Sequence, residues 1–100
     1  MKKLLVKVTR KHINKGLRFN SQYCPVALAL TEQIKLGDKQ YFRVCSDIAD
    51  IYIKTGKISY SIKPIERYYL PIIAQLFIDD FDRGKFVMPI AFELKVKGTW

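Results

Sequence analysis

Two prolines divide the chain into helical and extended segments. Pro25 and Pro71 each stand at the head of an apolar stretch, and Gly37 and Gly84 follow those stretches. Proline suits the first turn of a helix, because its missing N–H would be unpaired there, and glycine commonly ends a helix. We therefore expect one helix from Pro25 to Leu36 and a second from about Leu70 to Arg83.

The apolar positions predict how these two helices pack. The first two turns of the earlier helix are apolar almost all round, as is typical of a helix packed in the middle of a domain, with Val26, Ala29, Leu30 and Ile34 as the inward stripe. The later helix is amphipathic. Its expected inward residues are Ile73, Leu76, Phe77 and Phe81, with Gln75, Asp79 and Asp82 outside.

The remaining segments alternate apolar and polar residues, which indicates strands at 4–8, 41–45, 50–54, 57–62 and 92–96. Thr55-Gly56 is a tight-turn signal, so we expect 50–54 and 57–62 to form a hairpin. Thr9 and a left-handed Gly16 would bound a short helix over 10–15. This order predicts an α+β fold, in which a small, mostly antiparallel sheet carries two main helices on one face.

The chain has 100 residues, 49% of them hydrophobic, so we expect a single compact domain over 1–100. It holds no apolar run long enough to cross a membrane, and Lys7 interrupts the N-terminal apolar stretch before a signal peptide could form. We expect a cytoplasmic protein without a membrane partner. Cys24 and Cys45 match no metal-binding spacing and should be reduced.

Catalytic motifs are missing from the sequence, which holds one His and no phosphate-binding glycine loop. We interpret His12 as a plain polar residue on a surface turn, and Cys24 as a small buried side chain before Pro25. Asp79, Asp80 and Asp82 are interpreted as a solvated helix end rather than a metal site. The prediction is a protein that is not an enzyme, with no catalytic residues, no metal and no cofactor.

Charge is the strongest functional signal. Lys and Arg outnumber Asp and Glu by 18 to 9, and no acidic residue precedes Glu32. Such an excess of positive charge favours anionic partners, although it also keeps a small protein soluble by self-repulsion. The densest group of cations falls in and after the short helix, so we predict an anion-contacting set of Arg10, Lys11, Lys15 and Arg18.

Aromatic residues stand beside cations at two further places. Arg43 follows Tyr41-Phe42, and Arg67 precedes Tyr68-Tyr69. A cation that holds phosphate next to a ring that covers a base is what a nucleotide or nucleic-acid site needs. We interpret Phe42 as a core residue, and we add Arg43, Arg67, Tyr68 and Tyr69 to the predicted ligand-binding residues.

Three segments carry a resemblance to a known group. They are His12-Ile13-x-x-Gly16, Cys24-Pro25-Val26-Ala27-Leu28-Ala29-Leu30, and Phe81-Asp82-x-Gly84-x-x-Val87-x-Pro89. Together they resemble a group of small phage, prophage and bacterial proteins that has no settled activity. The resemblance implies a compact phage-type domain. Small phage proteins of this size often counter host defence or bind nucleic acid.

Two functions fit these features. The first is a non-catalytic phage sponge that sequesters a nucleotide-derived immune signal, with the pocket formed between copies of a homo-oligomer. The alternative is a basic nucleic-acid-binding accessory protein that contacts phosphates without reading bases. A protein–protein inhibitor of a host defence enzyme is also compatible with the sequence.

Overall fold

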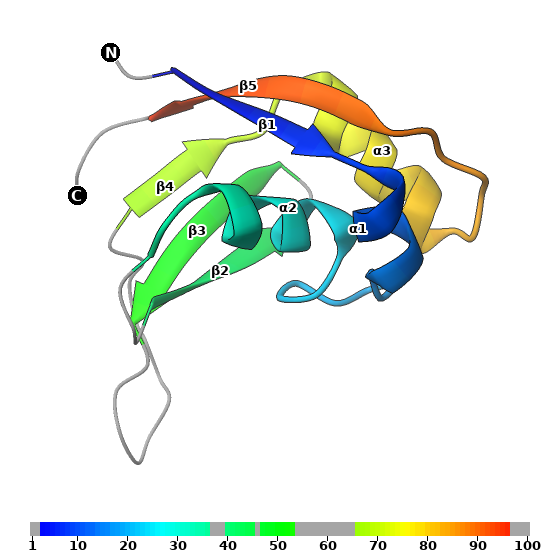
Figure 1. Cartoon of the computed structure of the whole chain (residues 1–100), viewed down its shortest axis with the longest axis horizontal. Coiled ribbons are helices and arrows are strands. Elements are labelled where there is room, and N and C mark those ends of the chain that lie inside the picture. The colour runs from blue at the N-terminus through cyan, green and yellow to red at the C-terminus, as the bar shows by residue number, and fades with distance from the viewer. Residues whose placement is uncertain (1–2, 37–39, 46, 54–65, 97–100) are drawn as a thin grey trace.

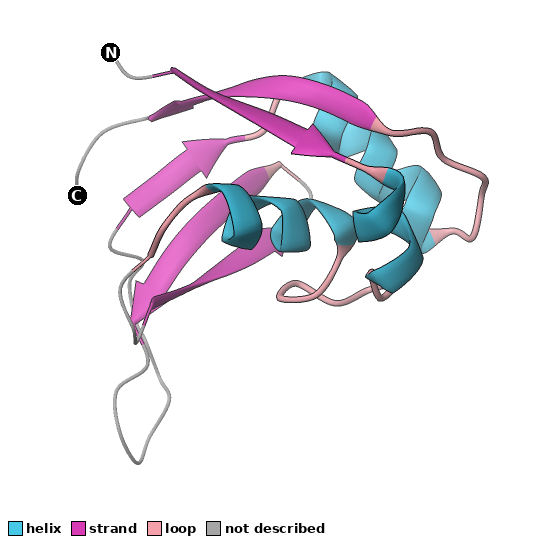
Figure 2. Ribbon diagram, in the orientation of Figure 1, coloured by secondary structure: helices cyan, strands magenta, loops and turns pink. Residues whose placement is uncertain are grey.

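The computed structural model describes residues 3–36, 40–45, 47–53 and 66–96 (Figures 1 and 2). In these residues, five strands form one antiparallel sheet of order β1-β5-β4-β3-β2, and helices pack against it. The α+β prediction is therefore confirmed. The elements are β1 (Lys3–Val8), α1 (Arg10–Lys15), α2 (Pro25–Gln33), β2 (Gln40–Cys45), β3 (Ile48–Ile53), β4 (Glu66–Tyr69), α3 (Ile72–Asp82) and β5 (Ile90–Val96).

One hydrophobic core lies between the helices and the inward face of the sheet. Opposite residues of neighbouring strands supply it in pairs, such as Val6 with Phe92 and Phe42 with Ile51. Helix α2 contributes side chains from nearly all round, as expected, and α3 contributes Ala74 and Phe77. Because both helices share this core with alternate strand residues, they cover the same face of the sheet.

Helix α2 packs against both edge strands, β1 and β2, and lies between them in Figure 1. Its Gln33 side chain accepts from the Lys7 N–H at 2.8 Å and donates to the Lys7 carbonyl at 2.6 Å. On the other edge, the Val44 N–H donates to the Ser21 carbonyl at 2.8 Å. These bonds occupy part of each edge that would otherwise be free to pair with another chain.

Two predicted helix ends are corrected by the structure. Helix α2 stops at Gln33, and Ile34 is already extended, so the helix is three residues shorter than its sequence signals suggest. Gly16 is extended at φ −70°, not left-handed. Gly16 is needed because the backbone here passes close to Pro25. A Cβ at this position would lie 2.5 Å from Cγ of Pro25. Gly84 does adopt the left-handed conformation, at φ 79°.

Helix α3 is rotated relative to the predicted inward stripe. Ala74 and Phe77 are buried, and Ile78 and Phe81 pack against the core. Ile73 and Leu76 are instead 46% and 58% exposed. Apolar residues lie on both sides of this helix, so periodicity alone could not fix its rotation, and the small Ala74 lets the helix axis approach the core.

The middle of the sheet differs from the prediction in one strand. β4 was not predicted, because residues 66–69 show no clear alternation of apolar and polar side chains. The expected strand at 57–62 and its Thr55-Gly56 turn lie outside the described residues. The strand predicted at 50–54 is β3, and it begins two residues earlier, at Ile48.

Candidate functional site

The outward side of the sheet, here called the open face, faces away from the core. The strand register sets its side chains in rows, of which one joins Arg43, Asp50 and Arg67 and the next joins Tyr41 and Tyr52. Each of these residues alternates along its strand with an inward core residue such as Phe42 or Ile51. The face therefore presents tyrosines and arginines from β2, β3 and β4 next to one another.

A bidentate ion pair forms the centre of the open face. The Arg67 Nε donates to Asp50 Oδ1 at 2.7 Å, and a terminal nitrogen of the guanidinium donates to Oδ2 at 2.8 Å. Asp50 is only 3% exposed. The hydrogen bond to Asp50 raises the pKa of Arg67, with a smaller contribution from Tyr69, so the guanidinium stays charged. Fork-to-fork pairing of this kind fixes the orientation of the arginine.

Two tyrosines and a second arginine flank this pair. The rings of Tyr41 and Tyr52 are stacked, with centroids 5.8 Å apart and planes at 23°. The Arg43 guanidinium lies 5.6 Å from the centroid of the Tyr52 ring, within cation–π range. On β4, Tyr69 is 45% exposed. We call Tyr41, Arg43, Asp50, Tyr52, Arg67 and Tyr69 the tyrosine–arginine cluster.

The cluster has the chemistry of a stacking platform. Ring faces stack on bases of any sequence, and arginines bind phosphate or stack on bases themselves. Several protein modules that bind single-stranded RNA use aromatic residues on an exposed sheet in this way. The internal contacts hold Arg43 and Arg67 in place before any ligand arrives, which lowers the entropy lost on binding.

The predicted residues Arg43, Arg67 and Tyr69 lie together in this cluster, but Tyr68 does not. Tyr68 points to the opposite face, is 4% exposed, and its hydroxyl donates to Glu66. Burial raises its pKa, with Glu66 adding to the effect. A buried ring cannot stack on a ligand, so the inclusion of Tyr68 is corrected. Strand alternation separates Tyr68 from Tyr69, which the sequence prediction had treated alike.

The N-terminal cations lie around α1 and make contacts of their own. Arg10 donates to the Val87 carbonyl at 3.2 Å and lies 5.3 Å from the centroid of the Phe86 ring. Lys11 lies 3.9 Å from Glu32. Arg18 borders Gly84, where a Cβ would be 3.2 Å from the guanidinium. Arg10 and Arg18 thus support the loop after α3, and Lys15 is exposed on α1.

His12 is buried rather than on the surface, so that expectation is wrong. It is 4% exposed, its Nδ1 accepts from the Thr9 N–H at 2.9 Å, and its Nε2 lies 2.9 Å from Glu32 Oε1. An Nδ1 that accepts leaves the proton on Nε2 to donate to Glu32. The ring therefore links the start of α1 to α2. This contact depends on how α1 packs against α2 and could not be predicted from composition.

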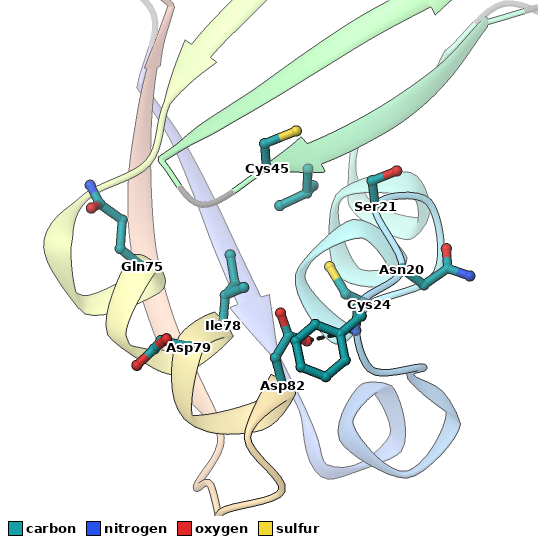
Figure 3. Close-up of a pocket in the computed structure, with 10 residues that line it drawn as sticks. Asn20, Ser21, Cys24, Cys45, Gln75, Ile78, Asp79 and Asp82 are labelled. Atoms are coloured by element: carbon teal, nitrogen blue, oxygen red, sulfur yellow. Dashed lines mark hydrogen bonds between the residues drawn. The ribbon is translucent and has the colours of Figure 1, made fainter.

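A cavity of about 280 Å³ separates α3 from the loop that precedes α2 (Figure 3). Both cysteines line it, together with Asp79 and Asp82, and none of its described lining residues is Lys or Arg. Asp82 accepts from the Phe19 N–H at 2.9 Å. Burial raises the pKa of the Cys24 thiol, whose sulfur accepts from the Ala27 N–H. The cavity does not suit a phosphate, and Cys24 is a helix cap, in line with its structural interpretation.

Comparison with protein families, curated proteins and solved structures gives no match for this chain. The resemblance to phage proteins therefore stays a prediction. None of the helices in the described segments is long and apolar enough to cross a membrane.

Sequence reasoning missed Asp50 and Tyr52, and it noted Tyr41 beside Arg43 without adding it to the predicted site residues. The signal was present in part, because inward Phe42 and Val44 place their neighbours Tyr41 and Arg43 outward. The pairing of Asp50 with Arg67, however, depends on strand register across 17 residues of sequence. No local pattern contains that information.

Proposed function

We propose that the protein binds single-stranded nucleic acid on its open face and does so without catalysis. The observation that carries this proposal is the stacked Tyr41–Tyr52 pair with Arg43 beside it, in register with the fixed Arg67. Bases would stack on the half-buried rings of Tyr41 and Tyr52 and on the exposed ring of Tyr69, and phosphates would contact the guanidiniums. The overall charge of +9 favours such a polyanionic ligand.

The shape and charge of the molecule favour a strand over a sequestered nucleotide. A nucleotide sponge needs an enclosed site that buries most of its ligand. The cavity beside α3 is lined by Asp79 and Asp82, which repel phosphate. The tyrosine–arginine cluster lies instead on a sheet surface that runs over three strands, where an extended ligand can follow the rows.

Fluorescence anisotropy with labelled single strands of about 12 nucleotides tests the proposal. Tyr69→Ala should weaken binding about tenfold, because loss of one base–aromatic stack costs about 1–3 kcal/mol. Arg43→Ala should weaken binding and reduce the salt dependence of log affinity by the contribution of one phosphate, about 0.7 for a single strand. Lys15→Ala is the matched control, since it removes one positive charge from α1 but leaves the cluster intact.

Two further ligands, a duplex and a small nucleotide, distinguish single-strand binding from the alternative functions. A duplex of equal length should bind more weakly than the single strand, because its paired bases cannot stack on the tyrosines. Tight binding of a cyclic or ADP-ribose-type nucleotide, with no binding of single strands, would favour the sponge and contradict the proposal. A larger effect from Lys15→Ala than from Arg43→Ala would move the site to α1.

A further inference from the structure

The cavity beside α3 borders the open face. Cys45, the last residue of β2, lines this cavity and is exposed, whereas its neighbour Val44 is buried. Cys45 therefore lies on the same side of β2 as Arg43. The strand register places Cys45 in one row with Ile48 and Tyr69. A ligand that continues beyond the tyrosine–arginine cluster along this row reaches the cavity.

The loop before α2 holds an exposed aromatic ring at the edge of the cavity. Phe19 lines the cavity and is 81% exposed. Its φ is 54°, a left-handed conformation that costs free energy for a bulky residue. Oδ1 of Asp82 accepts from the Phe19 N–H at 2.9 Å, and Oδ1 of Asn20 accepts from two further N–H groups of the loop at 3.0 Å. A strained residue that is held in place and exposes its ring is typical of a ligand contact.

Asp82 gives the cavity an available hydrogen-bond acceptor. One of its oxygens faces the loop, and the other points into the space between Ile78 and Cys24 (Figure 3). Among the described residues, no hydrogen bond or ion pair engages this second oxygen. An ionised carboxylate can only accept, so a ligand in the cavity must bring its own N–H or O–H donors.

The size and the charge of the cavity fit a single nucleobase better than a whole nucleotide. Its volume of about 280 Å³ lies at the lower limit of pockets for drug-sized ligands, which run from about 300 to 1,000 Å³. A base is neutral, so Asp79 and Asp82 do not repel it, and its planar face suits the Phe19 ring. Its phosphate would stay on the open face beside Arg43. A free organic cation would meet the same carboxylates, but the net charge of +9 repels it.

We infer that this cavity binds one unstacked guanine of the strand held on the open face, an inference that rests on the proposed function. The Watson–Crick edge of guanine presents two adjacent donors, N1–H and N2–H₂, so a carboxylate oxygen of Asp82 meets only donors. Adenine and cytosine place a ring-nitrogen acceptor beside their amino group, and thymine places its N–H between two carbonyls. Those acceptors would face the Asp82 carboxylate and be repelled. The cavity therefore gives the stacking platform a preference for strands that contain guanine.

Fluorescence anisotropy with labelled strands of about 12 nucleotides tests the inference. It compares oligothymidylate with strands in which one central thymine is replaced by guanine or by adenine. The guanine strand should bind wild type about tenfold more tightly than oligothymidylate, as expected of a two-donor base contact. The adenine strand controls for purine stacking and should bind like oligothymidylate.

Asp82→Asn should remove the guanine preference. Its amide oxygen can still accept from the Phe19 N–H, but its N–H₂ group then faces the donors of guanine. Asp80→Asn is the matched control, because it removes the same charge from α3 and Asp80 is not among the described residues that line the cavity. Phe19→Ala should also reduce the preference without changing the urea midpoint of unfolding, because the ring is exposed.

Equal binding of all three strands by wild type would overturn the inference and leave the proposed function intact. A guanine preference that survives in Asp82→Asn, or that is lost equally in Asp80→Asn, would overturn it as well. If wild type binds none of the strands, the proposed function fails, and the inference fails with it.

Discussion

Asp50 and His12 are buried polar side chains in the described core, and each has a partner distant in sequence. Asp50 binds Arg67 across two strands, and His12 joins Thr9 to Glu32 across two helices. Neither partner could be predicted from spacing. The sequence analysis interpreted His12 as a surface residue and gave Asp50 no role beyond the start of a predicted strand.

Asp50→Asn should destabilise the fold by about 2–3 kcal/mol. The amide keeps one oxygen but turns an N–H₂ toward the Arg67 guanidinium, which leaves that cation without its carboxylate. Urea unfolding at pH 7 measures the loss. Glu93→Gln, an exposed position on β5, is the control and should change stability by no more than about 0.5 kcal/mol. Equal losses of unfolding free energy in the two variants would show that the Asp50–Arg67 ion pair does not stabilise the fold.

Stability should fall as pH rises above about 10, the ordinary pKa of tyrosine. Burial raises the pKa of Tyr68 well above that value, so the unfolded chain loses this proton before the folded chain does. Ionisation of Tyr68 in the unfolded chain therefore lowers the free energy of unfolding by up to about 1.4 kcal/mol per pH unit above pH 10. Below pH 9 this group costs no stability. Urea unfolding of Tyr68→Phe should show less of this alkaline loss, and exposed Tyr23→Phe should retain it. The same slope in both variants would exclude Tyr68 as its source.

At the scale of elements, helix starts were predictable from the sequence, and rotations and short strands were not. Pro25 is the first residue of α2, as predicted, whereas Pro71 is the N-cap of α3, which begins at Ile72, two residues after the predicted start. β4 was missed because Glu66-Arg67-Tyr68-Tyr69 has no apolar alternation of its own, and its pairing with β3 defines it. Ile73 and Leu76 were assigned to the core because exposed apolar residues on a helix resemble a core face in sequence.

Gln33→Ala should cost about 1–2 kcal/mol, because it removes both hydrogen bonds between α2 and the Lys7 backbone. It should also promote aggregation, since the N–H and carbonyl of an edge strand become available for pairing. Urea unfolding and light scattering over time measure the two effects. Gln22→Ala, on the loop before α2, is a control of the same residue type. Unchanged stability and scattering in Gln33→Ala would mean that the edge is protected by other contacts.

At the scale of the molecule, the sequence predicted an anionic ligand and placed its main contacts in the N-terminal third, whereas the structure groups Arg43, Arg67 and Tyr69 on the open face. Charge density favoured the N-terminal third, where Arg10 and Arg18 turn out to support the loop after α3. Predicting the open face would have required the full strand order. Its cations come from β2 and β4, and its rings come from β2, β3 and β4. Composition predicts a class of ligand, whereas the proposed site depends on the order of the strands.

The most direct test of the central claim is an NMR titration of the labelled protein with a short single-stranded oligonucleotide. Backbone amide shifts should change at Arg43, Tyr52 and Tyr69, and should stay nearly constant at Lys11 and Lys15 on α1. Base stacking on the cluster predicts this pattern, because ring-current effects are local. Shifts confined to α1 and the loop after α3, with none on β2, β3 or β4, would contradict the assignment of the open face as the binding surface.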